Sequence, residues 1–561
     1  MEDNMSLNAE IKISEDFSYL EREEFTSEIF KIEIRNLGIF GIGELKKLLR
    51  NQFSLDASKI KSPRRRDFAY VCFRTQEDQE SALKKLNGFK WKGKILSVSP
   101  AKAAPDPLAR KRREENSCPG LSKRRKTCLE ATCPLGHLKY EEQVTKKKIE
   151  MEELLKVFGC ELKKLNPQAK NLCFKSNSMD MPCEFLGLKL SPQVDGYRNK
   201  TEFAVGKNAE GSIVVGFRLG SYADGSVEVG SLEGLPHISE KVKLAAKTFE
   251  EFIISSKYKI FNPENNSGHF KQLGVRNSVT SGEIMLIIGV YSGNLNNEEI
   301  EGLKNEVTDF YRSYDENIFK CDSLYYQDLN RRDAGQMMNP VDHLLGKTYI
   351  TDEIHSLKFR ISPLAFFQIN TKGAGILYEK VIELARPTKN TIVLDICCGT
   401  GTIGLCFAKH CKKVLGVEII PDAVKDAEYN AKENNIKNCK FFTGNSDDYI
   451  QTMVRETYYE NVEKNELDIV AIVDPPRAGL HNRSILALRS AHGLNRLVYI
   501  SCNPKSAQRN WLDLARPESK SYKGQPFFPK LAVAVDMFPH TAHTEMVVLF
   551  ERVTVNDQNL I

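Results

Sequence analysis

A cysteine follows an apolar run near the C-terminus, in a position that suits nucleophilic chemistry. The segment from Val498 to Ile500 predicts a buried strand, and Ser501, Cys502, Asn503 and Pro504 follow it directly. Active sites gather at the carboxyl ends of parallel strands. Because a thiolate is an effective nucleophile, the position indicates a catalytic Cys502 rather than a structural thiol. A free thiol has a pKa of about 8.5, so we expect the site to lower the pKa of Cys502.

A carboxylate stands at a comparable position further along the chain. Glu545 ends the polar segment that starts at Asp536, and the apolar run Val547 to Phe550 follows at once. A carboxylate at the entrance of so apolar a strand is expected to have a function.

A glycine loop between a strand and a helix predicts a nucleotide-type cofactor site. Val393 to Gly404 contains the pattern G-x-G-x-x-G, and Glu418 follows about 20 residues on. Alone, this pattern also fits a nicotinamide dehydrogenase. Asp395 and the strand end at Asn445 favour S-adenosylmethionine instead. Asp395 would attract the cationic amino group of this cofactor, Glu418 would accept its two ribose hydroxyls, and the glycines would let the backbone approach it.

The fourth apolar strand ends in Asp474-Pro475-Pro476-Arg477. Methyltransferases that act on exocyclic amines carry an aromatic residue after the two prolines, so Arg477 argues against N-methylation. Cytosine-C5 methyltransferases carry their cysteine directly after the proline, and this chain has none there. The cysteine on the next strand, Cys502, takes that place.

These residues need a parallel sheet to bring them together. Apolar runs at Thr391 to Leu394, Val414 to Val417, Ile469 to Val473 and Leu497 to Ile500 alternate with helical stretches. This βαβ pattern predicts an α/β, Rossmann-like domain over residues 350–552, with a tail at 553–561.

The N-terminal part alternates strand, helix, strand, strand, helix and strand, which predicts a ferredoxin-like RNA-recognition domain over residues 29–100. Arg66 to Phe73 fits the long motif of such domains except at Asp67. Phe68 and Tyr70 would stack on bases from one face of the sheet. Glu33 replaces the aromatic residue of the partner strand and cannot stack, so ordinary strand aromatics remain the alternative. Arg64, Arg65 and Arg66 are expected to add phosphate contacts.

Two further segments are predicted to lack regular structure. Residues 1–28 form an acidic tail, and residues 101–139 form a basic linker. The clusters Arg110 to Arg113 and Lys123 to Lys126 fit a bipartite nuclear localisation signal or an RNA-contacting linker, with a merely solvated linker as the alternative.

Residues 140–345 are predicted to form a helical connector and a central mixed α+β RNA-binding domain. Short strands here interleave basic and aromatic residues, and Arg198, Lys200 and Arg218 are the expected phosphate or base contacts. The alternative is that they are ordinary strand residues paired with Glu202 and its neighbours.

The composition agrees with an intracellular protein of several domains. The chain has 561 residues, of which 80 are Lys or Arg and 74 are Asp or Glu, so any nucleic-acid contact must rest on local charge. Its 14 cysteines are diluted over a long chain and indicate reduced thiols. Met1 to Glu10 is polar, so no signal peptide is expected, and the longest apolar run, Ile284 to Tyr291, is too short for a membrane span of about 18 residues.

Three motifs together resemble the RNA uracil-C5 methyltransferase family. They occupy residues 474–479, 501–504 and 536–545, and the similarity extends over about Tyr140 to Arg552. The resemblance implies Cys502 as nucleophile and Glu545 as general base. It implies a cofactor site built from Gln368, Cys397, Gly399, Gly401, Thr402, Glu418, Asn445 and Asp474. Some members bind an iron–sulfur cluster through four upstream cysteines, but this chain lacks their spacing, so we expect neither a cluster nor another metal.

The resemblance also implies the reaction. Cys502 would add to C6 of a flipped-out uracil, C5 would take the methyl group, and Glu545 would remove the C5 proton. The expected product is 5-methyluridine at conventional position 54 in the T-loop, and the expected partner is the tRNA T-arm, with no membrane and no obligate protein partner. The alternatives are action on another RNA (ribosomal, messenger or mitochondrial) and an inactive RNA-binding protein that keeps the fold. Cytosolic and nuclear localisation is expected.

Overall fold

The computed structural model describes residues 28–38, 41–62, 67–104, 126–169, 173, 181–220, 226–293, 295–330, 339–459, 468–491 and 493–552. They belong to two compact units, and each is described by itself. The first lies within Met1–Arg125 together with Leu219–Glu228 and Asn262–Ser267, and the second holds the rest of the chain from Lys126. Four of the sequence predictions lie outside the described residues: the acidic tail before Glu28, the arginines 64–66, the basic clusters apart from Lys126, and the tail at 553–561. No helix in the described ranges is both long and apolar enough to cross a membrane.

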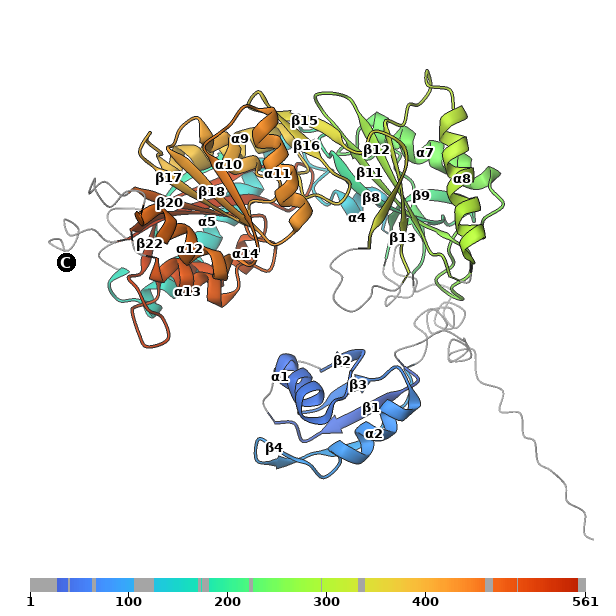
Figure 1. Ribbon diagram of the computed structural model, residues 1–561, viewed down its shortest axis with the longest axis horizontal. Coiled ribbons are helices and arrows are strands. Elements are labelled where there is room, and N and C mark those ends of the chain that lie inside the picture. Colours follow the sequence, from blue (N-terminus) through green and yellow to red (C-terminus); the bar gives the residue numbers. More distant parts are fainter. Residues whose placement is uncertain are drawn as a thin grey trace, which may run out of the picture. The chain divides into compact units, whose positions relative to one another are not determined.

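The N-terminal part of the first unit is a four-stranded sheet with the order β2-β3-β1-β6. Helices and strands alternate as the sequence predicts, with a small hairpin before the last strand (Figure 1). The Tyr70 ring packs edge-on against Phe68 with centroids 5.6 Å apart, and Glu33 is the cross-strand partner of Tyr70. The elements are β1 (Lys31–Arg35), α1 (Ile42–Lys47), the π-helical turn η2 (Leu48–Gln52), β2 (Lys59–Lys61), β3 (Ala69–Cys72), α2 (Gln76–Leu86), β4 (Lys90–Trp91), β5 (Lys94–Ile95) and β6 (Ser97–Pro100).

The second unit contains a seven-stranded sheet with the order β10-β9-β8-β11-β12-β13-β14. Only the pair β12 and β13 is parallel among these strands. Helices α7 and α8 bury their apolar sides against one face of this sheet, which we call the covered face, and leave the opposite, open face to other contacts (Figure 1). The elements are α4 (Cys128–Thr132), β8 (Lys200–Lys207), β9 (Ile213–Arg218), β10 (Val229–Gly230), α7 (Glu240–Ser255), β11 (Phe270–Asn277), β12 (Ile284–Val290), α8 (Asn297–Ser313), β13 (Ser323–Asp328) and β14 (Val341–Gly346).

The same unit contains an eight-stranded sheet with the order β19-β18-β17-β20-β21-β23-β22-β7. Its first five strands are parallel, while β23 runs antiparallel to both of its neighbours. Helices α9, α10 and α11 cover one face, and α5, α12, α13 and α14 cover the other. The strands are β7 (Glu184–Lys189), β17 (Ile392–Ile396), β18 (Lys413–Glu418), β19 (Cys439–Thr443), β20 (Ile469–Val473), β21 (Leu494–Ser501), β22 (Phe527–Val535) and β23 (Glu545–Arg552). The hairpin β15 (Ile350–Ile354) and β16 (Leu357–Ile361) precedes this sheet, and its helices are α5 (Tyr140–Leu165), α9 (Thr371–Ala385), α10 (Thr402–Ala408), α11 (Pro421–Glu433), α12 (Ser446–Tyr459), α13 (Asn482–Ser490) and α14 (Pro504–Ala515).

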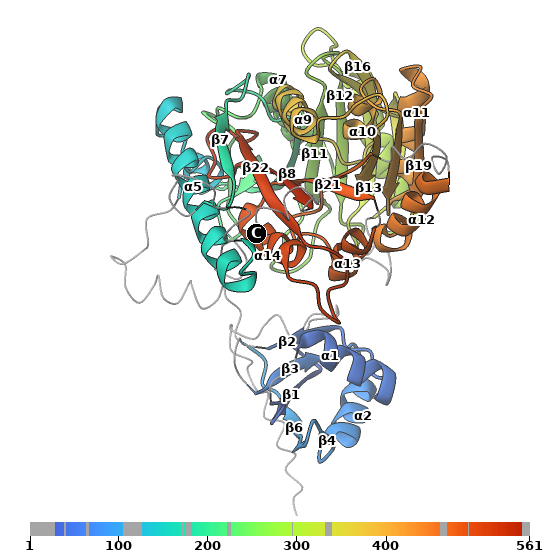
Figure 2. The same cartoon turned by 90° about the vertical axis from the view of Figure 1, so that its left-hand side faces the viewer.

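Two elements that precede residue 350, β7 and α5, are part of the domain built on this sheet. The predicted boundary at residue 350 therefore does not separate the central domain from the catalytic domain. Strand β7 pairs with β22 in parallel and thereby satisfies the backbone groups at the edge of β22. Helix α5 packs beside β7 and α14 (Figure 2). The Phe158 ring on α5 lies 5.4 Å from the Trp511 ring on α14, centroid to centroid, and both side chains are fully buried.

Candidate active site

One thiol and two carboxyl side chains meet at one edge of the eight-stranded sheet. Cys502 follows β21, Asp474 follows β20, and Glu545 is the first residue of β23. Because β23 is antiparallel to β21, its beginning lies beside the end of β21, and Ser501 is paired with Met546. The register of the sheet therefore brings together the predicted nucleophile and the predicted base, which are distant in sequence.

The surroundings of Cys502 contradict the expectation of a lowered pKa. Burial raises the pKa of the Cys502 thiol to about 11, and the negative charges of Glu545 and Asp474 act in the same direction. Arg477 opposes them through its positive charge and a hydrogen bond to the thiol. In the protein alone, two nearby carboxylates and partial burial thus outweigh the one cation that favours the thiolate.

The two carboxylates themselves hold protons more firmly than usual. Glu545 is 1% exposed, and burial and the charge of Asp474 raise its pKa well above the ordinary value, against the effect of Arg477. Its Oε2 atom has no hydrogen-bond partner among the described residues. Burial raises the pKa of Asp474 to about 7, and its Oδ2 accepts a hydrogen bond from Gln368 Nε2 at 3.4 Å. A buried carboxylate with a raised pKa is suited to accept a proton near neutral pH.

A buried ion pair holds the loop that leads to Glu545. Lys147 Nζ on α5 lies 2.7 Å from Asp536 Oδ1, and the two side chains are 1% and 0% exposed. Lys147 Nζ also donates to the Phe538 carbonyl at 2.9 Å. The sequence prediction missed this role of Lys147. A lysine on the apolar side of an amphipathic helix, four residues before Met151, was the signal that could have revealed it.

Asp395 lies at the end of β17, where the glycine loop begins. It is fully buried, and its Oδ2 accepts a hydrogen bond from the Gly404 amide at 2.9 Å, which ties the strand to helix α10. Its Oδ1 has no hydrogen-bond partner among the described residues, and burial raises its pKa to about 7. The contact of Asp395 with the amino group of the cofactor stays a prediction.

Glu418 and the glycine loop lie beside each other and form a cradle with open space at Gly399. Glu418 Oε2 accepts from the Gly399 amide at 3.1 Å, and Oε1 accepts from the amides of Ile419 and Ile420. Gly399 has a left-handed φ of +54°, and a Cβ atom there would meet nothing within 4 Å. Open space thus lies beside a carboxylate, as a ligand with hydroxyl groups requires. Gly401, with a φ of +77°, has no such room, because a Cβ atom would lie 3.0 Å from Ala427 and Phe441.

The other predicted cofactor residues surround this cradle. Cys397 has a left-handed φ of 66° at the start of the loop, and Thr402 Oγ1 lies 3.1 Å from the Tyr378 hydroxyl. Asn445 is exposed just after β19, at the same edge of the sheet. The residues present therefore fit a cofactor with hydroxyl and charged groups. In the described ranges, no group of three or more His, Cys, Asp or Glu side chains is arranged to hold a metal ion.

The residues that are predicted to contact RNA lie in different parts of the structure. Arg198 faces the catalytic edge: burial lowers its pKa, and the positive charge of Arg477 lowers it further. Lys200 Nζ lies 3.6 Å from Glu202 Oε1 on the open face of the central sheet, so the pairing that the alternative predicted is present. Arg218 is exposed at the end of β9. Phe68 and Tyr70 belong to the first unit.

The central sheet also holds the segment that carries Gln368. Asn199 Nδ2 donates to the Gln368 carbonyl and to Thr371 Oγ1, both at 2.8 Å. Arg276 on β11 donates to the carbonyls of Pro363, at 3.1 Å, and Ala365. Arg276 is 3% exposed. Neither residue was predicted, because the pattern of their strands gives no sign of a partner in a distant loop.

Comparisons with known proteins agree with this geometry. The family model described as tRNA (Uracil-5-)-methyltransferase matches residues 307–553. The human tRNA (uracil-5-)-methyltransferase homolog A is 39% identical over 545 residues, which cover 96% of this chain and 85% of that protein. The human homolog B is 36% identical over 423 residues, or 75% of this chain and 82% of that protein.

A solved structure shows the same fold. The Pyrococcus abyssi tRNA (uracil-54, C5)-methyltransferase, in complex with S-adenosyl-L-homocysteine, matches with a TM-score of 0.52 and 21% identity, and the match covers 88% of this chain and 92% of that chain. Because the similarity to homolog A spans almost the whole of this sequence and most of that protein, the chain belongs to the tRNA (uracil-5-)-methyltransferase family.

Proposed function

We propose that the protein transfers a methyl group from S-adenosylmethionine to C5 of uridine at conventional position 54 in the tRNA T-loop. The observation that carries this proposal is the meeting of Cys502, Glu545 and Asp474 at one sheet edge, next to the cradle of Glu418 and Gly399. The similarity to the tRNA (uracil-5-)-methyltransferase homologs and to the archaeal tRNA (uracil-54, C5)-methyltransferase supports the choice of substrate.

The residues of the chain divide the chemistry between them. The thiolate of Cys502 forms a bond to C6, and the electron pair of the C5–C6 double bond moves to C5 and O4 as an enolate. The carbon C5 then accepts a methyl group. Glu545 takes the proton from C5, the double bond re-forms, and the bond between sulfur and C6 breaks to release Cys502.

The cofactor, when bound, supplies an electrophilic methyl group on a sulfonium. Glu418 would hold its hydroxyl groups, since this carboxylate is fixed by three backbone amides beside open space at Gly399. Gln368 and Asp474, joined by a hydrogen bond, would complete the site on the side of Cys502. Two arginines also support the RNA side of the site: the positive charges of half-buried Arg198 and exposed Arg477 act on each other near the catalytic edge, and both side chains would bind phosphate.

A covalent-trap experiment tests the nucleophile. Fluorine at C5 cannot be removed as a proton, so tRNA that contains 5-fluorouridine should form a stable adduct with the wild-type protein and cofactor. The Cys502→Ala variant should form no adduct and transfer no methyl group, yet still bind tRNA. Cys160→Ala, at an exposed cysteine on α5, is the matched control and should behave as the wild type does. Turnover by Cys502→Ala would exclude Cys502 as nucleophile.

The base is tested with unmodified tRNA. Glu545→Gln keeps the shape of the side chain but cannot accept the C5 proton, so the methylated adduct should accumulate at Cys502. Normal product release by this variant would remove Glu545 from the base role.

The remaining assignments are proposals about contacts and location. We propose that Lys200, Arg218, Phe68 and Tyr70 contact RNA outside the catalytic edge, and that the protein works in both cytosol and nucleus. Substitution of each of these four residues, one at a time, should weaken tRNA binding. The rate of methyl transfer to tRNA that is already bound should stay unchanged. Fluorescent tagging of the full chain tests the location, and exclusion from either compartment would contradict it.

A further inference from the structure

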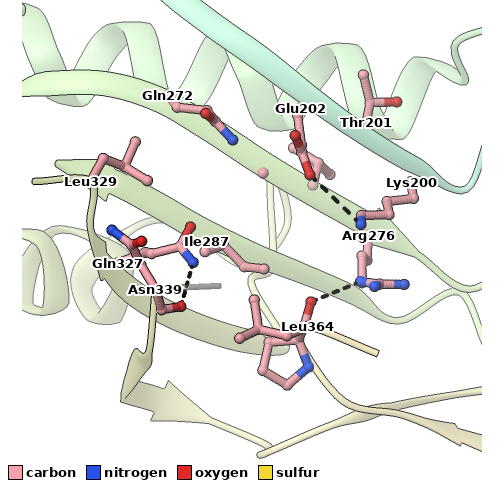
Figure 3. Close-up of a pocket in the computed structure, with 13 residues that line it drawn as sticks. Lys200, Thr201, Glu202, Gln272, Arg276, Ile287, Gln327, Leu329, Asn339 and Leu364 are labelled. Carbon is pink, nitrogen blue, oxygen red and sulfur yellow. Dashed lines mark hydrogen bonds and ion pairs between the residues drawn. The ribbon is translucent and has the colours of Figure 1, made fainter. Parts of the chain in front are cut away.

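A small cavity lies on the open face of the central sheet, outside the catalytic edge. Its volume is about 160 Å³, and it lies between β8, β11, β12, the end of β13 and the segment at Pro363 and Leu364 (Figure 3). Drug-sized ligands usually occupy pockets of about 300–1,000 Å³. The space therefore suits one flat ring system and is too small for a whole nucleotide cofactor.

A glycine in the middle of a strand lines this cavity. Gln272, Gly274 and Arg276 alternate along β11 and point to the same face of the sheet. The missing side chain at Gly274 makes room for Ile287 of β12, because a Cβ atom at Gly274 would lie 3.2 Å from the Ile287 Cβ. Ile287 and Leu364 add apolar surface at the wall, as the flat faces of a base require.

Side-chain amides supply the polar edge. Gln272 and Gln327 line the cavity from opposite sides (Figure 3). Among the described residues, no hydrogen bond engages the Gln272 amide, and the buried Oδ1 atom of Asn339 has no partner. Gln327 Nε2 donates to the Asn339 carbonyl at 2.9 Å, which fixes the orientation of its side chain. An amide offers one donor and one acceptor side by side, which matches the edge of a nucleobase.

Charge and position connect the cavity to the catalytic segment. Two cations, Lys200 and Arg276, line it against one carboxylate, Glu202, so the rim attracts a polyanion. Arg276 also holds the carbonyls of Pro363 and Ala365, at the start of the loop that carries Gln368. The cavity and the catalytic site therefore share one loop as a common wall.

We propose that this cavity is a second nucleobase site, which takes one unstacked base of the RNA while the target uracil occupies the catalytic edge. The inference rests on the proposed function, because it requires an RNA substrate. It assigns Gln272 and Gln327 as residues that recognise the edge of that base, with Lys200 near its phosphate. An adenine is the base best suited to a glutamine amide.

An abasic scan tests the site with the full-length protein. T-arm hairpins that lack one base at a time are methylated under steady-state conditions. Removal of one particular base, other than the target, should raise KM about tenfold and leave kcat unchanged, as expected for a lost base contact. For the intact hairpin, Gln272→Ala and Gln327→Ala should raise KM to a similar degree. In these variants, removal of that one base should no longer raise KM, while removal of any other base should have the same effect as in the wild type.

Matched measurements separate a contact from a folding defect. Gln451→Ala removes another side-chain amide, which donates to Ala487 far along the chain from the cavity, and should keep the wild-type scan. With 2-aminopurine at the position found, fluorescence should rise on binding to the wild type and stay low with Gln272→Ala. If both glutamine variants keep the wild-type pattern of penalties, the second base site is refuted while the methyltransferase proposal stands. If the wild type methylates no hairpin and no tRNA, the proposed function fails and this inference falls with it.

Discussion

The reactivity of Cys502 toward an alkylating reagent depends on how the surrounding charges act on its thiol. With a pKa of about 11, only about one thiol in a thousand is ionised at pH 8. Because only the thiolate reacts, alkylation of Cys502 by iodoacetamide in the protein alone should accelerate about tenfold for each pH unit between 7 and 10. Partial burial acts in two ways, because it raises the pKa of the thiol and also slows the approach of the reagent at every pH.

Arg477 provides the sharper test, because its charge and its hydrogen bond favour the thiolate. A hydrogen bond to an ionised group is worth about 1.5–3 kcal/mol, and the exposure of Arg477 places its effect at the low end. Arg477→Met should therefore raise the pKa of Cys502 further and slow its alkylation at pH 8 about tenfold. Glu545→Gln removes a negative neighbour and should change the rate in the opposite direction.

The assay follows the tryptic peptide that contains Cys502 by mass spectrometry. Exposed Cys160 in the same samples reports the intrinsic reactivity of the reagent, and Cys502→Ala verifies the peptide assignment. A rate that levels off below pH 9 would refute the assigned electrostatics. Equal rates for Arg477→Met and the wild type would show that Arg477 does not act on the thiol.

Three further substitutions test the supports of the site. Lys147→Met strands the buried Asp536 carboxylate and should lower the free energy of unfolding by about 3–5 kcal/mol in urea titrations, whereas adding Asp536→Leu should restore most of it. Gly401→Ala should cost about 1–3 kcal/mol in the same assay, because its φ is +77° and the Cβ atom would lie 3.0 Å from Ala427. Glu418→Ala should weaken S-adenosylmethionine binding at least tenfold by calorimetry, and unchanged affinity would contradict the cradle.

Local patterns were enough to predict the elements that present the site. The apolar run at Ile469 to Val473 coincides with β20, and the run at Val414 to Val417 lies within β18, Lys413–Glu418. The residues that end such strands are also apparent in the sequence, since an apolar run followed by a polar residue marks both Asp474 and Cys502. Parallel order then places these ends at one edge without knowledge of any long-range contact.

Contacts between distant segments could not be predicted in this way. Strand β7 pairs with β22 although more than 300 positions separate them, as Leu531 opposite Glu184 illustrates, and no periodicity encodes such a partner. The charged helix α5 was expected to be a connector, because its sequence does not show that Lys147 meets a buried Asp536. The same limit explains the wrong expectation for the pKa of Cys502, which is raised by burial and by the charges of Glu545 and Asp474 once the sheet has formed.

The raised pKa values of Cys502 and Glu545 are consistent with the order of events in the proposed reaction. Two adjacent anions at this buried edge are unfavourable, so the protein alone keeps at least one proton on the pair. When the adduct collapses, the thiolate of Cys502 appears as Glu545 gains the C5 proton, so the edge carries one negative charge before and after that step. A second cation beside Cys502 would favour the thiolate, but it would also lower the pKa of Glu545. A lower pKa would make Glu545 a weaker base. Arg477 therefore acts on both groups at once, and its substitution should slow thiolate formation while making Glu545 a stronger base.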